Sequence, residues 1–280
     1  MEKNKIGITD GPKDNTGYNL ILSAFEEPVS LELNHPIIYG DKETAIQQRK
    51  VMNLTTNFIT ITNTKDVQDG RLSLLQCKES EKKALEDLKA VLIDSLVITH
   101  RREHISYPAE FMEMLINEDV HMALVDKVDN GTIETLRQTL ERDFDFQHPR
   151  IAILSDEAPR EEQTIEIEEK HTHVYGPYPI KEFFEEERYM FFDGIITSDR
   201  QKATDAFGAL VYEYSIRFFA GSDLIITSPF KSEVTSLNHA MYIATDVYRN
   251  RKIYDQEREN PLPKLFHDKR EDKNSNNQVE

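Results

Sequence analysis

Two pairs of histidines have a spacing that could hold a metal ion. His100 and His104 lie in the run H-R-R-E-H, which matches the H-x-x-E-H signature of inverted zinc proteases. That chemistry requires both imidazoles on one face of a helix. The run directly follows the apolar residues 96–99, which predict a buried strand, and Pro108 comes soon after. The pattern therefore favours a loop between a strand and a helix over a zinc-binding helix.

His171 and His173 form the second pair. They follow residues 164–169, whose alternation of apolar and acidic side chains predicts a half-exposed strand. Histidines at i and i+2 share a strand face and could bind a metal together with a neighbouring glutamate. Solvent-facing histidines on edge strands are common, however, and the sequence offers no third ligand. Cys77 ends an apolar run with no histidine beside it, which indicates a structural thiol. We therefore predict no metal site.

The composition restricts the classes of protein to which this chain can belong. The chain has 280 residues, 38% of them hydrophobic, which is ample for one large domain or two lobes. Its formal net charge of −17 argues against binding to nucleic acid or anionic membranes, because both partners need a basic surface. The chain has a single cysteine, no charged-then-apolar leader and no apolar run of roughly 20 residues. These features predict a protein of the reducing cytoplasm.

Short apolar runs alternate with amphipathic helical segments along the chain. Residues 122–125 and 151–154 have no polar face, as expected of parallel strands that are covered on both sides. Two further runs, residues 191–196 and 224–226, predict parallel strands joined by a helical crossover. This alternation predicts an α/β fold of two lobes, with a largely parallel mixed sheet and a cleft between the lobes.

Local signals predict several individual elements. Asp41 is placed to cap a helix that continues through Val51. Residues 58–61 and 71–75 are candidate strands separated by a turn, so they predict a hairpin. Residues 111–116 continue a predicted helix.

Several landmarks resemble one known family. They are Ala220-Gly221, Thr227-Ser228-Pro229, A-M-Y-I-A-T-D-V-Y-R-N-R-K at residues 240–252, P-I-I-Y-G at residues 36–40 and G-P-Y at residues 176–178. Together they resemble the 4-hydroxythreonine-4-phosphate dehydrogenase family of vitamin B6 (pyridoxine) biosynthesis. The resemblance covers roughly residues 5–263.

The resemblance implies a fold like that of isocitrate and isopropylmalate dehydrogenases. Two interleaved lobes would occupy residues 1–263, with residues 264–280 as a polar tail. The family works as a homodimer with a divalent metal held by three histidines, with NAD as hydride acceptor, and with Lys, Asn and Arg on the substrate phosphate. The aromatic-rich residues 207–219 add weak support for a dimer interface, since aromatic side chains are enriched at interfaces.

The chain departs from the family at its reactive loops. The family's Y-H-D-Q-G falls on residues 199–203, so Arg200 stands in place of a metal-binding histidine. Residues 126–130 and 155–159 occupy the other two metal-binding loops and contain no histidine. Counted without gaps, the three phosphate-binding positions fall on Gly208, Arg217 and Ile226. These changes predict that the chain uses neither the metal nor NAD and lacks the parent activity, because nothing would polarise or hold the substrate.

Two interpretations follow. The leading one is a non-catalytic homologue that acts as a dimeric binding or regulatory protein, paired with itself or with an active relative. The alternative is an NAD-linked enzyme or a metabolite-binding protein with a rebuilt anion site in the interlobe cleft. That site would hold a small anionic metabolite through Arg101, Arg102, Arg200, Lys202 and Lys231. A third and weaker interpretation is a scaffold that acts through its acidic surface or tail.

Overall fold

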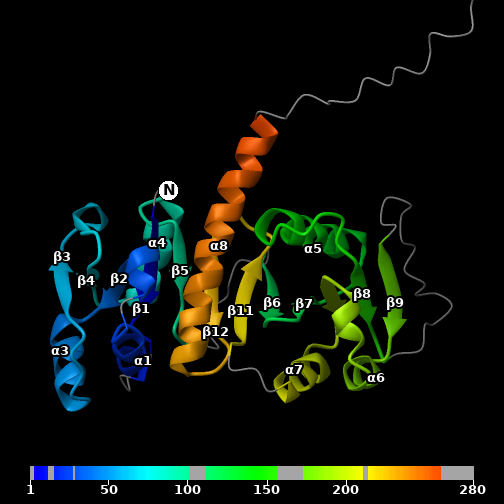
Figure 1. The fold of residues 1–280 in the computed structure, drawn as a ribbon, viewed down its shortest axis with the longest axis horizontal. Coiled ribbons are helices and arrows are strands. Elements are labelled where there is room, and N and C mark those ends of the chain that lie inside the picture. Colours follow the sequence, from blue (N-terminus) through cyan, green and yellow to red (C-terminus); the bar gives the residue numbers. More distant parts are fainter. Residues whose placement is uncertain are drawn as a thin grey trace, which may run out of the picture.

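The computed structural model describes residues 3–11, 16–27, 29–100, 111–156, 173–210 and 214–259. Helices and strands alternate along most of this chain (Figure 1). The N-terminal part contains β1 (Asn4–Thr9), α1 (Thr16–Ala24), α2 (Val29–Leu33), β2 (Asn34–Gly40), α3 (Lys42–Val51), β3 (Phe58–Ile61), β4 (Leu72–Gln76), α4 (Ser80–Lys89) and β5 (Ser95–Val97). The middle part contains β6 (Met112–Ile116), β7 (His121–Leu124), α5 (Asn130–Asp143), β8 (Ile151–Leu154), β9 (Val174–Tyr178), α6 (Ile180–Glu185), β10 (Gly194–Thr197), α7 (Arg200–Ala209) and β11 (Ile216–Ala220). The C-terminal part contains β12 (Ile226–Pro229) and α8 (Val234–Glu259).

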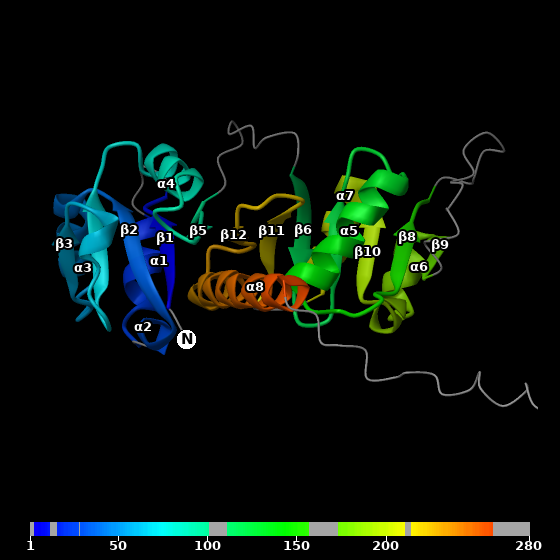
Figure 2. The same cartoon turned by 90° about the horizontal axis from the view of Figure 1, so that it is seen from above.

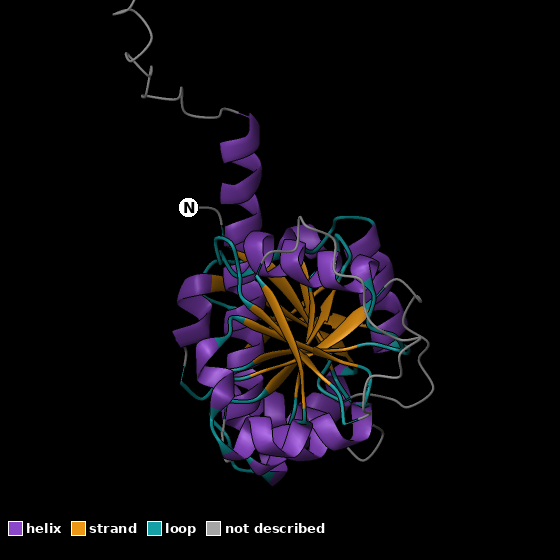
Figure 3. Ribbon diagram, turned by 90° about the vertical axis from the view of Figure 1, so that its right-hand side faces the viewer, coloured by secondary structure: helices purple, strands orange, loops and turns teal. Residues whose placement is uncertain are grey.

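The strands form one 12-stranded sheet in the order β3-β4-β2-β1-β5-β12-β11-β6-β7-β10-β8-β9. The first six strands in this order are parallel to one another, and so are the last four. Between these two blocks, β11 is antiparallel to β12 and β6, and β6 is antiparallel to β7. Seen end-on, the strands fan out with helices on both sides (Figure 3). The predicted α/β fold with a largely parallel mixed sheet is confirmed.

The two faces of the sheet carry different cores. On one face a single apolar cluster reaches from Leu74 in β4 to Ile153 in β8. It includes residues of α1, α5 and α8, and α8 crosses the middle of the molecule (Figure 2). On the other face there are two separate clusters, one with α4 and one with α6 and α7. Their boundary falls at the central strands, because Phe219 in β11 and Leu115 in β6 belong to different clusters.

Side-chain caps fix the starts of several helices. The carboxylate of Asp41 accepts a hydrogen bond from the Thr44 N–H at 2.8 Å, so α3 begins and ends as predicted. Asp129 and Thr132 form a capping box at the start of α5. None of the helices in the described ranges is long and apolar enough to cross a membrane.

A buried ion pair ties the C-terminal half of α8 to α5. Arg251 donates through Nε and Nη2 to the two carboxylate oxygens of Asp143, at 2.8 and 2.9 Å. Asn250 donates to the Asp143 carbonyl at 2.8 Å, and Arg142 donates to the same carboxylate at 2.8 Å. Asp143 is fully buried. Asn250 and Arg251, near the end of the landmark of residues 240–252, therefore anchor this helix.

Three predictions about strands were wrong. Residues 112–116 form β6 rather than a helix. A short apolar run such as this one fits both the helical and the strand periodicity, so its antiparallel pairing with β7 and β11 decides its conformation. β3 and β4 are parallel rather than a hairpin, since the chain between them crosses over through the short 3₁₀ helix Thr64–Asp66. β10 and β12 run in opposite directions and are separated by β11, β6 and β7.

Candidate functional site

A network of charged side chains lies where the two cores on the α4 and α7 face meet. Glu113 in β6 is buried, with 5% of its surface exposed. Its carboxylate accepts a hydrogen bond from Arg217 Nη1 at 2.5 Å and another, on its other oxygen, from Arg200 Nη1. Arg217 is in the neighbouring strand β11, and Arg200 is the first residue of α7. One carboxylate therefore holds two guanidinium groups, which leaves one positive charge in excess.

Both arginines make further contacts with the surrounding strands. Arg200 also donates to the Leu124 carbonyl at the end of β7, at 3.4 Å, and its side chain is 47% exposed. The guanidinium of Arg217 lies 4.8 Å from the ring centroid of Phe230, which directly follows β12. Contacts of this kind between a cation and a ring face are attractive. The network thus connects strands of both parallel blocks through the antiparallel pair between them.

A second ion pair lies on the same turn of α7. Lys202 Nζ is 2.8 Å from Asp156 and 3.2 Å from Asp199. The hydrogen bonds from Lys202 and from the Ile180 N–H, at the start of α6, lower the pKa of Asp156. The hydrogen bonds to Asp156 and Asp199 raise the pKa of Lys202. The carboxylate of Asp156 therefore already accepts hydrogen bonds from Lys202 and from the N-terminus of α6.

Lys202 and Asp156 border a cavity of about 430 Å³ between α6 and α7. Apolar side chains, among them Phe184 and Leu210, line it. Lys231 follows β12, and its side chain forms no ion pair within the described ranges. Neither Arg200 nor Lys231 is among the lining residues of this cavity.

The structure places three of the five predicted anion-binding residues. Arg200 and Lys202 share the first turn of α7 but pair with different carboxylates, and Lys231 lies near the network through its neighbour Phe230. Arg101 and Arg102 lie outside the described residues. The sequence reasoning missed Glu113 as a member of the site. The available signal was one acidic residue inside the apolar run M-E-M-L-I.

One member of each histidine pair, His104 and His171, lies outside the described residues. His100 and His173 are exposed, and the ring of His173 is 6.5 Å from that of His148. Within the described ranges, no group of three or more His, Cys, Asp or Glu side chains is arranged to hold a metal ion. Burial raises the pKa of the Cys77 thiol to about 11, so this side chain is a protonated, poor nucleophile near pH 7.

The fold is that of an α/β protein of the isocitrate/isopropylmalate dehydrogenase-like class. No family model matches the chain. A 4-hydroxythreonine-4-phosphate dehydrogenase from Bacteroides thetaiotaomicron is 30% identical to it over 352 aligned positions, which cover 97% of each chain. The chain belongs to the 4-hydroxythreonine-4-phosphate dehydrogenase family. Because the alignment is longer than the 280 residues of this chain, the relative contains segments that this chain lacks.

Solved structures show the same fold. A 4-hydroxythreonine-4-phosphate dehydrogenase from Klebsiella pneumoniae superposes with a TM-score of 0.64 at 15% identity, covering 86% of this chain and 100% of that one. The enzyme of the same name from Burkholderia phymatum gives 0.63 at 16% identity, covering 90% and 98%. A branched-chain phosphotransacylase from Enterococcus faecalis gives 0.56 at 11% identity, covering 87% and 99%. Such distant similarities support the fold and no more.

Proposed function

We propose that this chain is a non-catalytic member of its family that acts as a binding or regulatory protein. The observation that carries the proposal is the pairing of Arg200 with the buried Glu113. By the resemblance, Arg200 stands where the family has a metal-binding histidine. A guanidinium group is always positively charged and has no lone pair for a metal. Its guanidinium donates to Glu113, which it shares with Arg217, so the side chain is part of an internal network.

The other two loops support the same conclusion. Asp156 lies in the loop that replaces the third histidine, and Lys202 and the N-terminus of α6 already hold its carboxylate. Residues 126–130 contain two aspartates, and one of them, Asp129, caps α5. These residues do not fit a divalent metal. Without a metal, the chain has no means of polarising the substrate hydroxyl as the family does.

An assay with 4-phosphohydroxy-threonine, NAD and added zinc or magnesium tests this proposal. We expect no NADH from this chain, with the Bacteroides thetaiotaomicron relative as the active control. Arg200→His should restore nothing, because metal, phosphate and cofactor contacts act as a unit and their effects are not additive. Metal-dependent NADH formation by the wild-type chain would refute the proposal. Elemental analysis that finds about one divalent ion per purified chain would also count against it.

The surplus charge of the network favours a second candidate function. Two guanidinium groups face one carboxylate, and Arg200 remains about half exposed. A small phosphorylated or carboxylated metabolite could bind there, next to Lys231. In that case such a metabolite should raise the melting temperature, and Arg200→Gln or Lys231→Ala should abolish the rise. If no metabolite has an effect and an active relative co-purifies, the regulatory role is favoured.

A further inference from the structure

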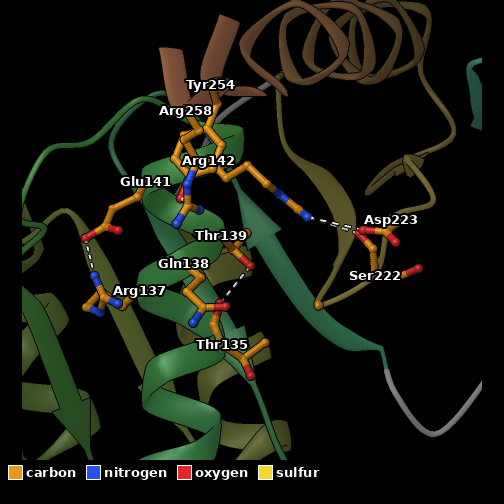
Figure 4. Close-up of a pocket in the computed structure, with 11 residues that line it drawn as sticks. Thr135, Arg137, Gln138, Thr139, Glu141, Arg142, Ser222, Asp223, Tyr254 and Arg258 are labelled. Atoms are coloured by element: carbon orange, nitrogen blue, oxygen red, sulfur yellow. Dashed lines mark hydrogen bonds and ion pairs between the residues drawn. The ribbon is translucent and has the colours of Figure 1, made fainter. Parts of the chain in front are cut away.

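A second cavity, which is polar, lies along the C-terminal half of α5. Its volume is about 600 Å³, within the range of small-molecule sites. Figure 4 shows that its lining comes from α5, from the turn after β11 and from the last turns of α8. It includes Arg142 on α5, Ser222 in the turn, and Tyr254 and Arg258 on α8. None of these residues belongs to the network around Glu113.

The charges on the cavity wall are unevenly balanced. Arg137 is neutralised by Glu141 at 2.5 Å and by Glu134 at 2.6 Å. Arg142 donates to the buried Asp143, but that single carboxylate is shared with Arg251. Two further acidic groups act on Arg142: Asp223, which is fully exposed and 3.4 Å away, and Asp255 on α8, which is also exposed. The charges of both exposed carboxylates are largely screened by solvent and salt. Among the groups that are not exposed, the Arg142 side of the cavity therefore has two arginines, Arg142 and Arg251, and one carboxylate, Asp143.

Of the arginines that line the cavity, Arg258 has the most N–H donors available for a ligand. Its Nη1 donates to the Tyr254 hydroxyl at 2.7 Å, and its guanidinium lies 5.0 Å from the centroid of that ring. It forms no ion pair with any residue of the described chain. A guanidinium presents several N–H donors in a planar fork, and only one is used here. Arg258 can thus bind an oxyanion without breaking an internal pair.

Two hydroxyl groups complete the set of donors. The Tyr254 oxygen accepts from Arg258, and the Ser222 oxygen accepts from the Leu224 N–H at 3.1 Å. Both hydroxyl hydrogens remain available for donation. They come from two sides of the cavity, so a bound anion must offer several oxygens that point in different directions. A tetrahedral phosphate group does this, whereas a planar carboxylate has only two oxygens.

We propose that this cavity binds a small phosphorylated compound, with Arg258, Tyr254 and Ser222 as its phosphate ligands and Arg142 as a second positive charge. The proposal is independent of the proposed function, since it uses no residue of the Glu113 network. It assigns a ligand-binding role to the end of α8. Pyrophosphate is a suitable probe, because it carries phosphate oxygens at both ends and fits easily within the cavity.

Thermal unfolding and isothermal titration of the full chain with pyrophosphate test the proposal. We expect saturable binding and a rise in melting temperature of a few degrees, beyond the effect of sodium chloride at equal ionic strength. Arg258→Gln should weaken binding at least tenfold, because it removes the main charge. Arg249→Gln is the matched control. It removes the same charge from the same helix, away from the cavity, and should bind like the wild type.

Three results would overturn the proposal. They are the absence of saturable pyrophosphate binding by the wild type, equal effects of pyrophosphate and sodium chloride, and unchanged affinity in Arg258→Gln. Arg200→Gln separates this site from the candidate anion site near Glu113. If pyrophosphate binding survives Arg258→Gln but is lost in Arg200→Gln, the binding site is the network around Glu113 and not this cavity. Because Arg258 is exposed on the last turn of α8, its substitution should leave the folded structure intact.

Discussion

His121, the first residue of β7, makes folding sensitive to mild acid. Its ring packs against Phe144 and Phe146, with centroids 4.8 and 5.2 Å away, and burial lowers its pKa to about 4. The unfolded chain takes up a proton at a pH of about 6.5, which the folded chain resists until about pH 4. The free energy of unfolding should therefore fall by about 3 kcal/mol as the pH drops from 7 to 4 through this group alone.

Urea denaturation at several pH values measures this effect. His121→Phe keeps an aromatic ring in the pocket but cannot be protonated, so its stability should depend less on pH than that of the wild type. The pKa values of His35 and His239 are also lowered by burial, and both residues remain in the variant. Their contribution therefore cancels in the comparison. Identical pH dependence of the two proteins would show that His121 is not the group responsible.

The candidate site was only partly predictable at the scale of residues. Arg200 and Lys202 could be placed together because both fall on residues 199–203, where the family has its Y-H-D-Q-G loop. Glu113 could not, because residues 111–116 were read as helix and its partner Arg217 is about a hundred residues further along the chain. Contacts that depend on strand pairing over such a distance leave no local pattern in the sequence.

Among the elements, the attachment of α8 to α5 depends on one arginine. Removing the side chain of Arg251 leaves the fully buried Asp143 with only Arg142, so part of its charge becomes unpaired. We expect Arg251→Ala to reduce the free energy of unfolding by about 3–5 kcal/mol, as for other broken buried pairs. Chemical denaturation of both proteins measures the difference.

Arg249→Ala provides the comparison for that experiment. It lies in the same turn of α8, and its partner Asp246 is 62% exposed at 3.8 Å. Its loss should cost at most about 1 kcal/mol, which is typical of surface pairs. If the two substitutions cost the same, the contacts of Arg251 with Asp143 are not what holds α8 in place.

The elements themselves were predicted better than their pairing. Residues 122–125 and 151–154 form β7 and β8 as expected, because fully apolar runs of this length fit a strand covered on both faces. The Asp41 cap fixed the bounds of α3 from local chemistry alone. The supposed hairpin of β3 and β4 failed because turn residues between two strands do not determine whether the strands are parallel. That outcome depends on the neighbouring strand β2.

For the whole molecule, we predict a homodimer in solution, chiefly from the family resemblance. Of the aromatic residues in 207–219, Phe207, Phe218 and Phe219 are buried in the core of the chain itself, whereas Tyr214 is 42% exposed. Met190 and Phe191 are further interface candidates, because both large apolar side chains are more than half exposed. Light scattering at micromolar concentration should give twice the chain mass, and a monomer would contradict the prediction. Phe191→Asp should weaken the dimer if this surface is the interface.

The position of β12 has a consequence for how the chain folds during synthesis. This strand is made almost last, yet it lies between β5 and β11 near the middle of the sheet. While the polypeptide is still emerging from the ribosome, β5 and β11 each have an unpaired edge where β12 will later insert. Exposed edges of this kind are templates for pairing with other chains. Nascent chains that stop before residue 226 should therefore need chaperones, whereas a chain that includes β12 fills this gap between β5 and β11.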